Sequence, residues 1–94
     1  MPNFAILCFD KPDSSALRAA TRPRHLEYLE QIAGTAVVAG PMVDSDGVVV
    51  GSVIIAPFAD RAAAQAFADN DPYAQAGLFG KVVVNEWRQV LPRA

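Results

Sequence analysis

The sequence is poor in the residues that build disulfide frameworks and metal centres. Its 94 residues include one cysteine, Cys8, and one histidine, His25. A lone cysteine cannot form a disulfide within the chain, and Cys8 lies in an apolar run, where a thiol packs as a small hydrophobe. One histidine and one cysteine do not make a zinc or transition-metal ligand set. We therefore expect a reducing, cytoplasmic location and neither a metal nor another cofactor.

Positive charge and long hydrophobic runs are also scarce. The 8 lysines and arginines are outnumbered by 10 aspartates and glutamates, so the formal net charge is -2. Such a chain is not drawn to phosphate backbones or anionic lipid, and we expect no nucleic-acid binding. No apolar run approaches the about 18 to 20 residues that span a bilayer, and no cationic stretch followed by an apolar region begins the chain. We expect neither a membrane segment nor a targeting signal.

Apolar residues are present in excess. They make up 52% of the chain before glycine is counted, whereas an average soluble domain has about 45 to 50% with glycine included. Ninety-four residues suffice for one domain with a real core but not for two. We therefore expect a single domain over residues 1–94, with more apolar surface than one core can cover.

Apolar runs separated by turn residues predict an alternation of strands and helices. The predicted strands are Asn3–Phe9, Thr35–Ala39 (ended by Gly40 and Pro41), Val48–Ala56 and Lys81–Leu91. The predicted helices are Ser14–Ala20 capped by Asp13, Arg22–Gly34 capped by Thr21, Arg61–Asp69 capped by Asp60, and one turn over Pro72–Gly77. Pro23 is expected to break or kink the chain between the first two helices. Leu29, Ile32 and Ala33 are expected to form the buried stripe of the second.

The order strand, helix, strand, strand, helix, strand is that of the ferredoxin-like βαββαβ fold, an α+β arrangement. Right-handed crossovers place both helices on one face of a four-stranded antiparallel sheet. The segment Val48–Ala56 is apolar on both of its faces, although a half-solvated strand should alternate apolar with polar residues. We therefore expect the bare sheet face to be buried against a second copy, as a homodimer with facing sheets.

His25 and Asp71 are the candidate chemical groups. His25 shares a helix face with Leu29 and points inward, where an imidazole needs a hydrogen-bond partner. Asp71 lies in helical register with Phe67 and is biased toward the same layer. A carboxylate bonded to one ring nitrogen would orient the imidazole and leave the other nitrogen free for proton transfer. Taken alone, His25 is more simply interpreted as a core histidine and Asp71 as a helix cap. When the two are considered as a pair, the functional and the structural interpretations are about equally favoured.

Other residues surround this pair. Arg22 and Arg24 can steer an anionic substrate or simply form a solvated helix end, and both alternatives stay open. Ser52 stands beside a glycine that permits close approach, and it can act as a hydrogen-bonding group or, less favoured, as a nucleophile. We expect the pocket between helices and sheet, near Gly40, Pro41 and Ser52. Tyr73 is a further candidate contact to the substrate, although aromatic residues more often pack in a core or dimer interface.

The motifs closely resemble those of the YciI-like family. They are Asp10-Lys11 with Asp13-Ser14, Arg22-Pro23-x-His25-Leu26, Ala39-Gly40-Pro41-Met42, Gly51-Ser52, Phe67-Ala68, Asp71-Pro72-Tyr73 and Ala76-Gly77-Leu78, and they cover nearly the whole chain. The resemblance implies a small dimeric α+β barrel, similar in fold to muconolactone isomerases. It also implies a catalytic histidine–aspartate dyad, which maps onto His25 and Asp71. A related chlorohydroxyhydroquinone dehydrochlorinase eliminates HCl from an aromatic-pathway intermediate.

Two functions follow from these observations. The first is a small lyase or isomerase in which His25, held by Asp71, moves a proton on a ring or carbonyl metabolite. The second is a non-enzymatic module that binds a small ligand in the same barrel. Haem binding through His25, as on some related barrels, is a third and less favoured possibility. No particular substrate is implied.

Overall fold

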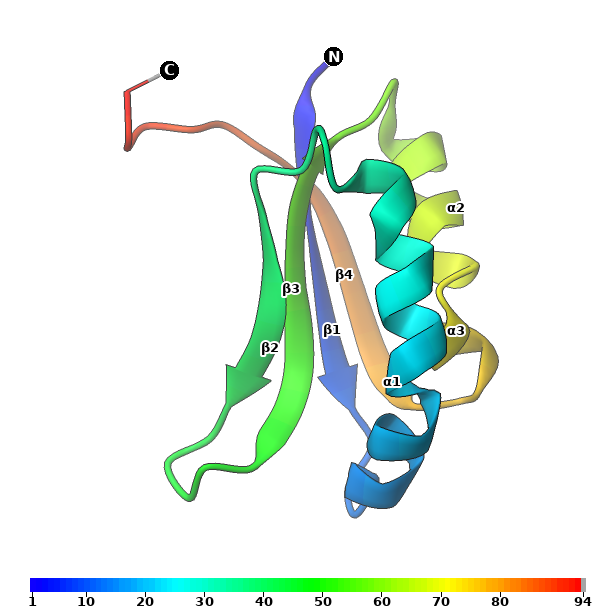
Figure 1. The fold of residues 1–94 in the computed structure, drawn as a ribbon. Coiled ribbons are helices and arrows are strands. Elements are labelled where there is room, and N and C mark those ends of the chain that lie inside the picture. The colour runs from blue at the N-terminus through cyan, green and yellow to red at the C-terminus, as the bar shows by residue number, and fades with distance from the viewer. Residues whose placement is uncertain (94) are drawn as a thin grey trace.

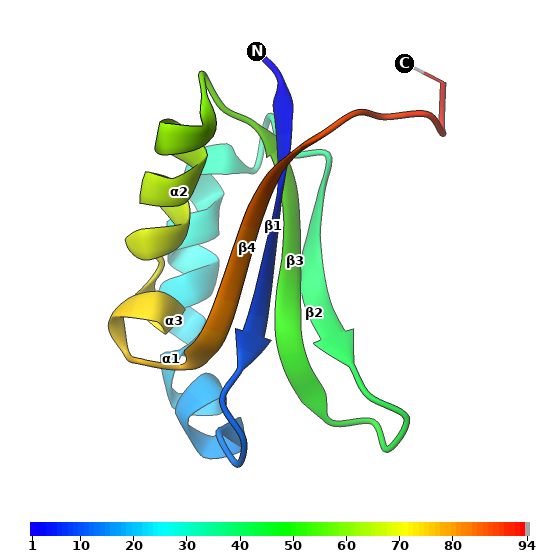
Figure 2. The same ribbon diagram turned by 180° about the vertical axis from the view of Figure 1, so that it is seen from behind.

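The computed structural model of the protein describes residues 1–93, and these form a four-stranded antiparallel sheet covered on one face by helices (Figure 1). The elements are β1 (Asn3–Asp10), α1 (Ser15–Leu29), the 3-10 helix η1 (Glu30–Ile32), β2 (Val38–Val43), β3 (Val49–Pro57), α2 (Arg61–Asp69), α3 (Pro72–Gln75) and β4 (Phe79–Trp87). The sheet order is β2-β3-β1-β4. The predicted ferredoxin-like fold is confirmed, and Figure 2 shows the opposite sheet face without a helix.

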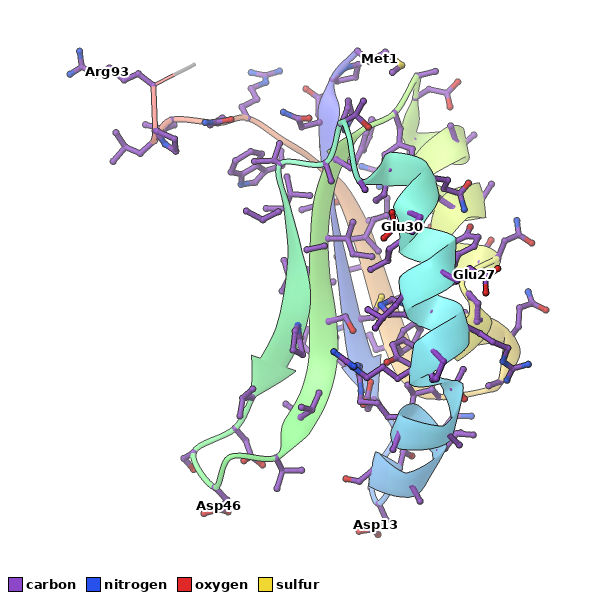
Figure 3. All side chains as sticks on the ribbon, viewed as in Figure 1. Met1, Asp13, Glu27, Glu30, Asp46 and Arg93 are labelled. Carbon is purple, nitrogen blue, oxygen red and sulfur yellow. The ribbon has the colours of Figure 1, made fainter. Side chains whose placement is uncertain are left out.

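The core lies between the two layers. Alternate residues of the central strand β1 face the helices, so Phe4, Ile6 and Cys8 are buried. Phe67 of α2 packs against them from the helical layer. Asp60 caps the start of this helix, and its side chain accepts a hydrogen bond from the Ala63 N–H, as the sequence predicts. Figure 3 shows side chains from both layers meeting in this space.

The prediction of two helices separated at Pro23 is wrong. A single helix, α1, runs from Ser15 to Leu29 with Pro23 inside it. Pro23 and Ala19, the residue whose carbonyl would accept the missing N–H, are both exposed, so water can satisfy that group. Thr21 is therefore not a cap but is buried within the helix.

The ends of this helix also differ from the expectation. Ser14, not Asp13, occupies the cap position, and Asp13 has a φ of 56° in the preceding turn. The regular helix ends before η1 and well before Gly34. The buried side of α1 carries Arg18, Thr21 and His25, whereas none of the predicted stripe residues Leu29, Ile32 and Ala33 is fully buried. The face that α1 turns inward is thus polar.

Two strand boundaries were also predicted wrongly. β2 starts at Val38 and contains Gly40 and Pro41, which were expected to end a strand at Ala39. β2 is at the sheet edge, where a strand can hold a proline because one of its two sides makes no ladder hydrogen bonds. In the register of β2 on β3, Pro41 lies opposite Ser52. The edge strand β2 therefore places Gly40 and Pro41, two residues of the predicted pocket, beside β3 and close to Ser52.

The last strand, β4, ends at Trp87 rather than Leu91. The residues after it form an arm that runs clear of the sheet, away from the helices (Figures 1 and 2). Val90 and Leu91 in this arm are 77% and 76% exposed. At the opposite end of the molecule, Asp13 and Asp46 occupy the β1–α1 and β2–β3 connections (Figure 3). Among residues 1–93, no helix combines the length and hydropathy needed to cross a bilayer.

Candidate functional site

His25 and Asp71 are in direct contact although 46 residues separate them in the chain. His25 lies in the second half of α1, and Asp71 is the N-cap of α3. The distance from His25 Nδ1 to Asp71 Oδ1 is 2.9 Å, and the two side chains are only 8% and 3% exposed. The same oxygen accepts a hydrogen bond of 2.8 Å from the Tyr73 backbone N–H. One oxygen atom of Asp71 therefore both caps the start of α3 and orients the imidazole of His25.

This contact determines which imidazole nitrogen is available. An ionised carboxylate can only accept hydrogen bonds, so the proton of the neutral imidazole is on Nδ1. Nε2 then carries a lone pair. Within residues 1–93, Nε2 has no hydrogen-bond partner. Because every fully buried side-chain nitrogen in these residues does have a partner, Nε2 is not fully buried. His25 borders a cavity, and Nε2 is the nitrogen that can act as a base there.

Tyr73 packs against the imidazole. Its ring is stacked on His25 with centroids 4.0 Å apart and planes at 20°, and its side chain is almost fully buried. The guanidinium carbon of Arg18 lies 4.5 Å from the same ring centroid. Burial raises the pKa of the Tyr73 phenol, and the charge of Arg18 offsets part of that increase. The tyrosine therefore stays a neutral phenol that holds two polar side chains in place.

Arg18 is a site residue that the sequence analysis missed. Its Nε and Nη2 donate to the two carboxylate oxygens of Asp10 at 2.7 and 2.8 Å, and Nη2 also donates to Ser52 Oγ at 2.9 Å. Burial lowers the pKa of Arg18, but the hydrogen bond and charge of Asp10 outweigh it and raise the pKa overall. The sequence does contain a signal for Arg18, because it lies seven residues, or two helical turns, before His25. The predicted interruption at Pro23 placed the two residues in different helices and so hid this relation.

A cavity of about 220 Å³ brings most of the predicted residues together. Its polar lining contains Arg18, Arg22, His25 and Ser52, and Tyr73 forms part of the wall. The remaining lining residues are Leu26, Leu29, Ala39, Gly40, Pro41 and Ile54. Every predicted contact residue thus borders one cavity. Asp71 is behind His25 and does not line it.

Two other residues considered in the sequence analysis lie outside the cavity. Arg22 and Arg24 are both exposed, but Arg24 lies on another side of α1 and, unlike Arg22, does not line the cavity. Cys8 is buried in the core next to Ser52 across the strand pair, and burial raises the pKa of its thiol to about 12. Within residues 1–93, no three histidine, cysteine, aspartate or glutamate side chains are grouped closely enough to hold a metal ion.

Two solved structures share the fold, and one of them is also similar in sequence. A 5-chloro-2-hydroxyhydroquinone dehydrochlorinase from Burkholderia phenoliruptrix, in complex with 2,5-dihydroxybenzoquinone, superposes with a TM-score of 0.86. It is 31% identical, over 92% of this chain and 93% of that one. An antibiotic biosynthesis monooxygenase, with a TM-score of 0.55 and 17% identity over 96% of this chain and 99% of that one, shows a likeness of fold alone.

Sequence comparison identifies the family. Protein YciI of Escherichia coli is 40% identical over 95 residues, which are 93% of this chain and 97% of that protein. The model of the YCII-related domain matches residues 3–88, and this stretch contains the four strands and helices that border the cavity, α1, β2, β3 and α3, as well as the His25–Asp71 contact. The chain belongs to the YCII-related domain family.

Proposed function

We propose that the protein is a small-molecule lyase or isomerase in which His25, oriented by Asp71, moves a proton on a ring or carbonyl compound. The observation that carries the proposal is the 2.9 Å contact between His25 Nδ1 and Asp71 Oδ1 at the border of a cavity. This contact leaves Nε2 as a base, and it provides a buried carboxylate to stabilise the imidazolium that forms.

The reaction needs no group beyond those of the chain. Nε2 takes a proton from an acidic C–H or O–H of the substrate, and the electron pair of that bond moves toward a conjugated carbonyl. In an isomerisation, the imidazolium returns the proton to a different atom of the same compound. In an elimination, the electron pair expels a leaving group such as chloride, and the proton passes from Nε2 to water. Both outcomes use one histidine as acid and base.

The size of the cavity favours a single ring. An apolar cavity of about 150 Å³ accommodates benzene, so about 220 Å³ leaves room for a ring with a few oxygen substituents. The related dehydrochlorinase acts on a chlorinated hydroxyhydroquinone and was crystallised with a dihydroxybenzoquinone. We therefore propose oxygenated rings of this size as the first compounds to test on the present protein.

We also propose that the functional form is a homodimer with facing sheets. The sheet face opposite the helices carries Leu7, Val53, Ile55 and Val83, which are only half-buried. A contiguous apolar face of this kind on a monomer favours an interface. The arm with Val90 and Leu91 extends on this same side (Figure 2). Charged substitution of Val53, which faces outward at the centre of the sheet, should yield monomers in sedimentation analysis.

The proposal is tested by replacing His25 with asparagine. The asparagine amide can still donate to Asp71, but the variant lacks Nε2. We expect it to retain the thermal unfolding midpoint of the wild type and to lose base-catalysed uptake of solvent deuterium into hydroxyquinones, measured by mass spectrometry. Arg24→Gln is the matched control on an exposed side of the same helix, and it should exchange like the wild type.

The outcomes separate the two candidate functions. Unchanged exchange by His25→Asn would remove the histidine from the mechanism. If the wild type binds hydroxyquinones but exchanges and eliminates nothing, and His25→Asn binds them equally well, the protein is a ligand-binding module instead of an enzyme.

A further inference from the structure

Two polar side chains of the cavity have hydrogen-bonding roles that the protein itself fixes. Ser52 Oγ accepts a hydrogen bond from Arg18 Nη2 at 2.9 Å, and Ser52 is only 3% exposed. No acceptor within residues 1–93 takes its hydroxyl hydrogen, so the hydroxyl can donate to a ligand. Because an arginine has no acceptor atom, it too can only donate. This part of the cavity lining is therefore complementary to a ligand oxygen that accepts hydrogen bonds.

Asp10 holds Arg18 in this position. Its carboxylate takes the Nε and one Nη2 hydrogen in a bidentate pair, a geometry that fixes the plane of the guanidinium. The pair leaves the two N–H groups of Nη1 outside the contacts with Asp10 and Ser52. Tyr73 packs on the guanidinium face. Asp10 is thus a positioning residue, and the donors of Arg18 are oriented before any ligand arrives.

The charged groups around the cavity suit two different tasks. His25 is hydrogen-bonded to the Asp71 carboxylate, which stabilises a proton that arrives on Nε2. Arg18 is paired with Asp10, and Arg22 has no ion pair within residues 1–93. These arginines stabilise negative charge that appears on a ligand oxygen. Preorganised donors aimed at developing charge are the arrangement of an oxyanion site.

We propose that Arg18 and Ser52 form an oxyanion site that binds the carbonyl oxygen of the substrate as it becomes an enolate. This inference rests on the proposed role of His25. It narrows the substrate class to carbonyl compounds whose acidic C–H or O–H is conjugated to the bound oxygen, such as hydroxyquinones and enolisable ketones. When Nε2 removes a C–H proton, the electron pair of the broken bond forms the new C=C bond and the carbonyl π pair moves onto the oxygen. When it removes an O–H proton, the electron pair left on that oxygen forms a new C=O bond, the conjugated C=C bond shifts, and the negative charge reaches the bound carbonyl oxygen.

A pair of probes tests the oxyanion site without turnover. Ionised 2,5-dihydroxybenzoquinone carries the delocalised negative oxygen of an enolate, and 2,5-dimethoxybenzoquinone is its neutral counterpart. We expect the wild type to bind the ionised compound more tightly in calorimetric titrations. Ser52→Ala should reduce this preference about 10-fold or more, since a hydrogen bond to a charged group is lost. Ser45→Ala, in the exposed hairpin turn, should leave the preference unchanged.

Kinetics provide a second measurement. Removing one oxyanion donor costs about 10² to 10³ in kcat in well-studied cases, so Ser52→Ala and Arg18→Lys should lower kcat much more than they change KM. Arg18→Lys keeps the positive charge beside Asp10 and avoids leaving a buried carboxylate unpaired. Unchanged thermal midpoints would show that both variants are folded.

The proposal is overturned if the wild type binds both quinones equally or if Ser52→Ala keeps the full preference and kcat. His25→Asn makes this result independent of the proposed function. It should lose turnover and keep the preference for the ionised quinone. A variant at His25 that retains turnover would refute the proton-transfer role, whereas the binding preference would still report on Arg18 and Ser52.

Discussion

Replacing Asp71 with asparagine separates the electrostatic role of this residue from its structural one. Oδ1 of Asp71 caps α3 through the Tyr73 N–H and also contacts His25 Nδ1. Asparagine caps helices about as well as aspartate and has nearly the same shape. The Tyr73 N–H should hold the amide oxygen in place, so the same atom still faces the imidazole. The variant should therefore fold normally and lose only the negative charge.

The size of the effect follows from the geometry. The contact atoms are 2.9 Å apart, and the two charges, spread over the ring and the carboxylate, are centred about 4 Å apart. With an effective dielectric constant of about 20, two unit charges at that separation interact by about 4 kcal/mol. Only part of the imidazolium charge has formed in the transition state, so we expect a loss of about 2 to 4 kcal/mol. This corresponds to a rate decrease of about 30- to 1,000-fold.

The assay is deuterium exchange or elimination with the best compound found for the wild type, measured alongside thermal unfolding. Asp69→Asn is the control, because Asp69 is an exposed carboxylate at the end of the neighbouring helix. Equal rates for Asp71→Asn and wild type would show that the carboxylate takes no part in proton transfer. A large loss of stability in the variant would instead refute the assumption that the amide preserves both hydrogen bonds.

Three further predictions concern stability. A side chain at Gly51 would collide with the Cys8 carbonyl and the Met42 methyl group, so Gly51→Ala should cost at least about 1 to 3 kcal/mol in urea unfolding, whereas Gly34→Ala, with open space around it, should not. Asp60→Ala should cost about 1 kcal/mol through loss of the α2 cap, and Asp60→Ser should recover most of it. Burial raises the pKa of Cys8 from 9.0 to about 12, so between these pH values the unfolded thiol ionises while the folded one stays protonated. Stability should therefore fall as pH rises through this window, less steeply in Cys8→Ala, and a steeper fall in that variant would contradict the assignment.

The sequence by itself determined the element order and hence the fold. The apolar run of β1, the turn residues after it and the Asp60 cap of α2 are local signals that act over a few residues, and the structure has these elements where the sequence indicates them. The inward bias of His25 also followed from helical spacing. Such signals can be read from the sequence because the capping hydrogen bonds and the hydrophobic periodicity involve only residues that are close together in the chain.

Only the tertiary structure decided the details of the cavity. Pro23 is tolerated within α1 because that side of the helix faces water, and the intact helix brings Arg18 onto the same face as His25. Gly40 and Pro41 continue β2 because one of the two sides of an edge strand makes no ladder hydrogen bonds. Local sequence favoured the opposite choice at both prolines. The pairing of Arg18 with Asp10 and Ser52 depends on packing between helix and sheet, so no local pattern could reveal it.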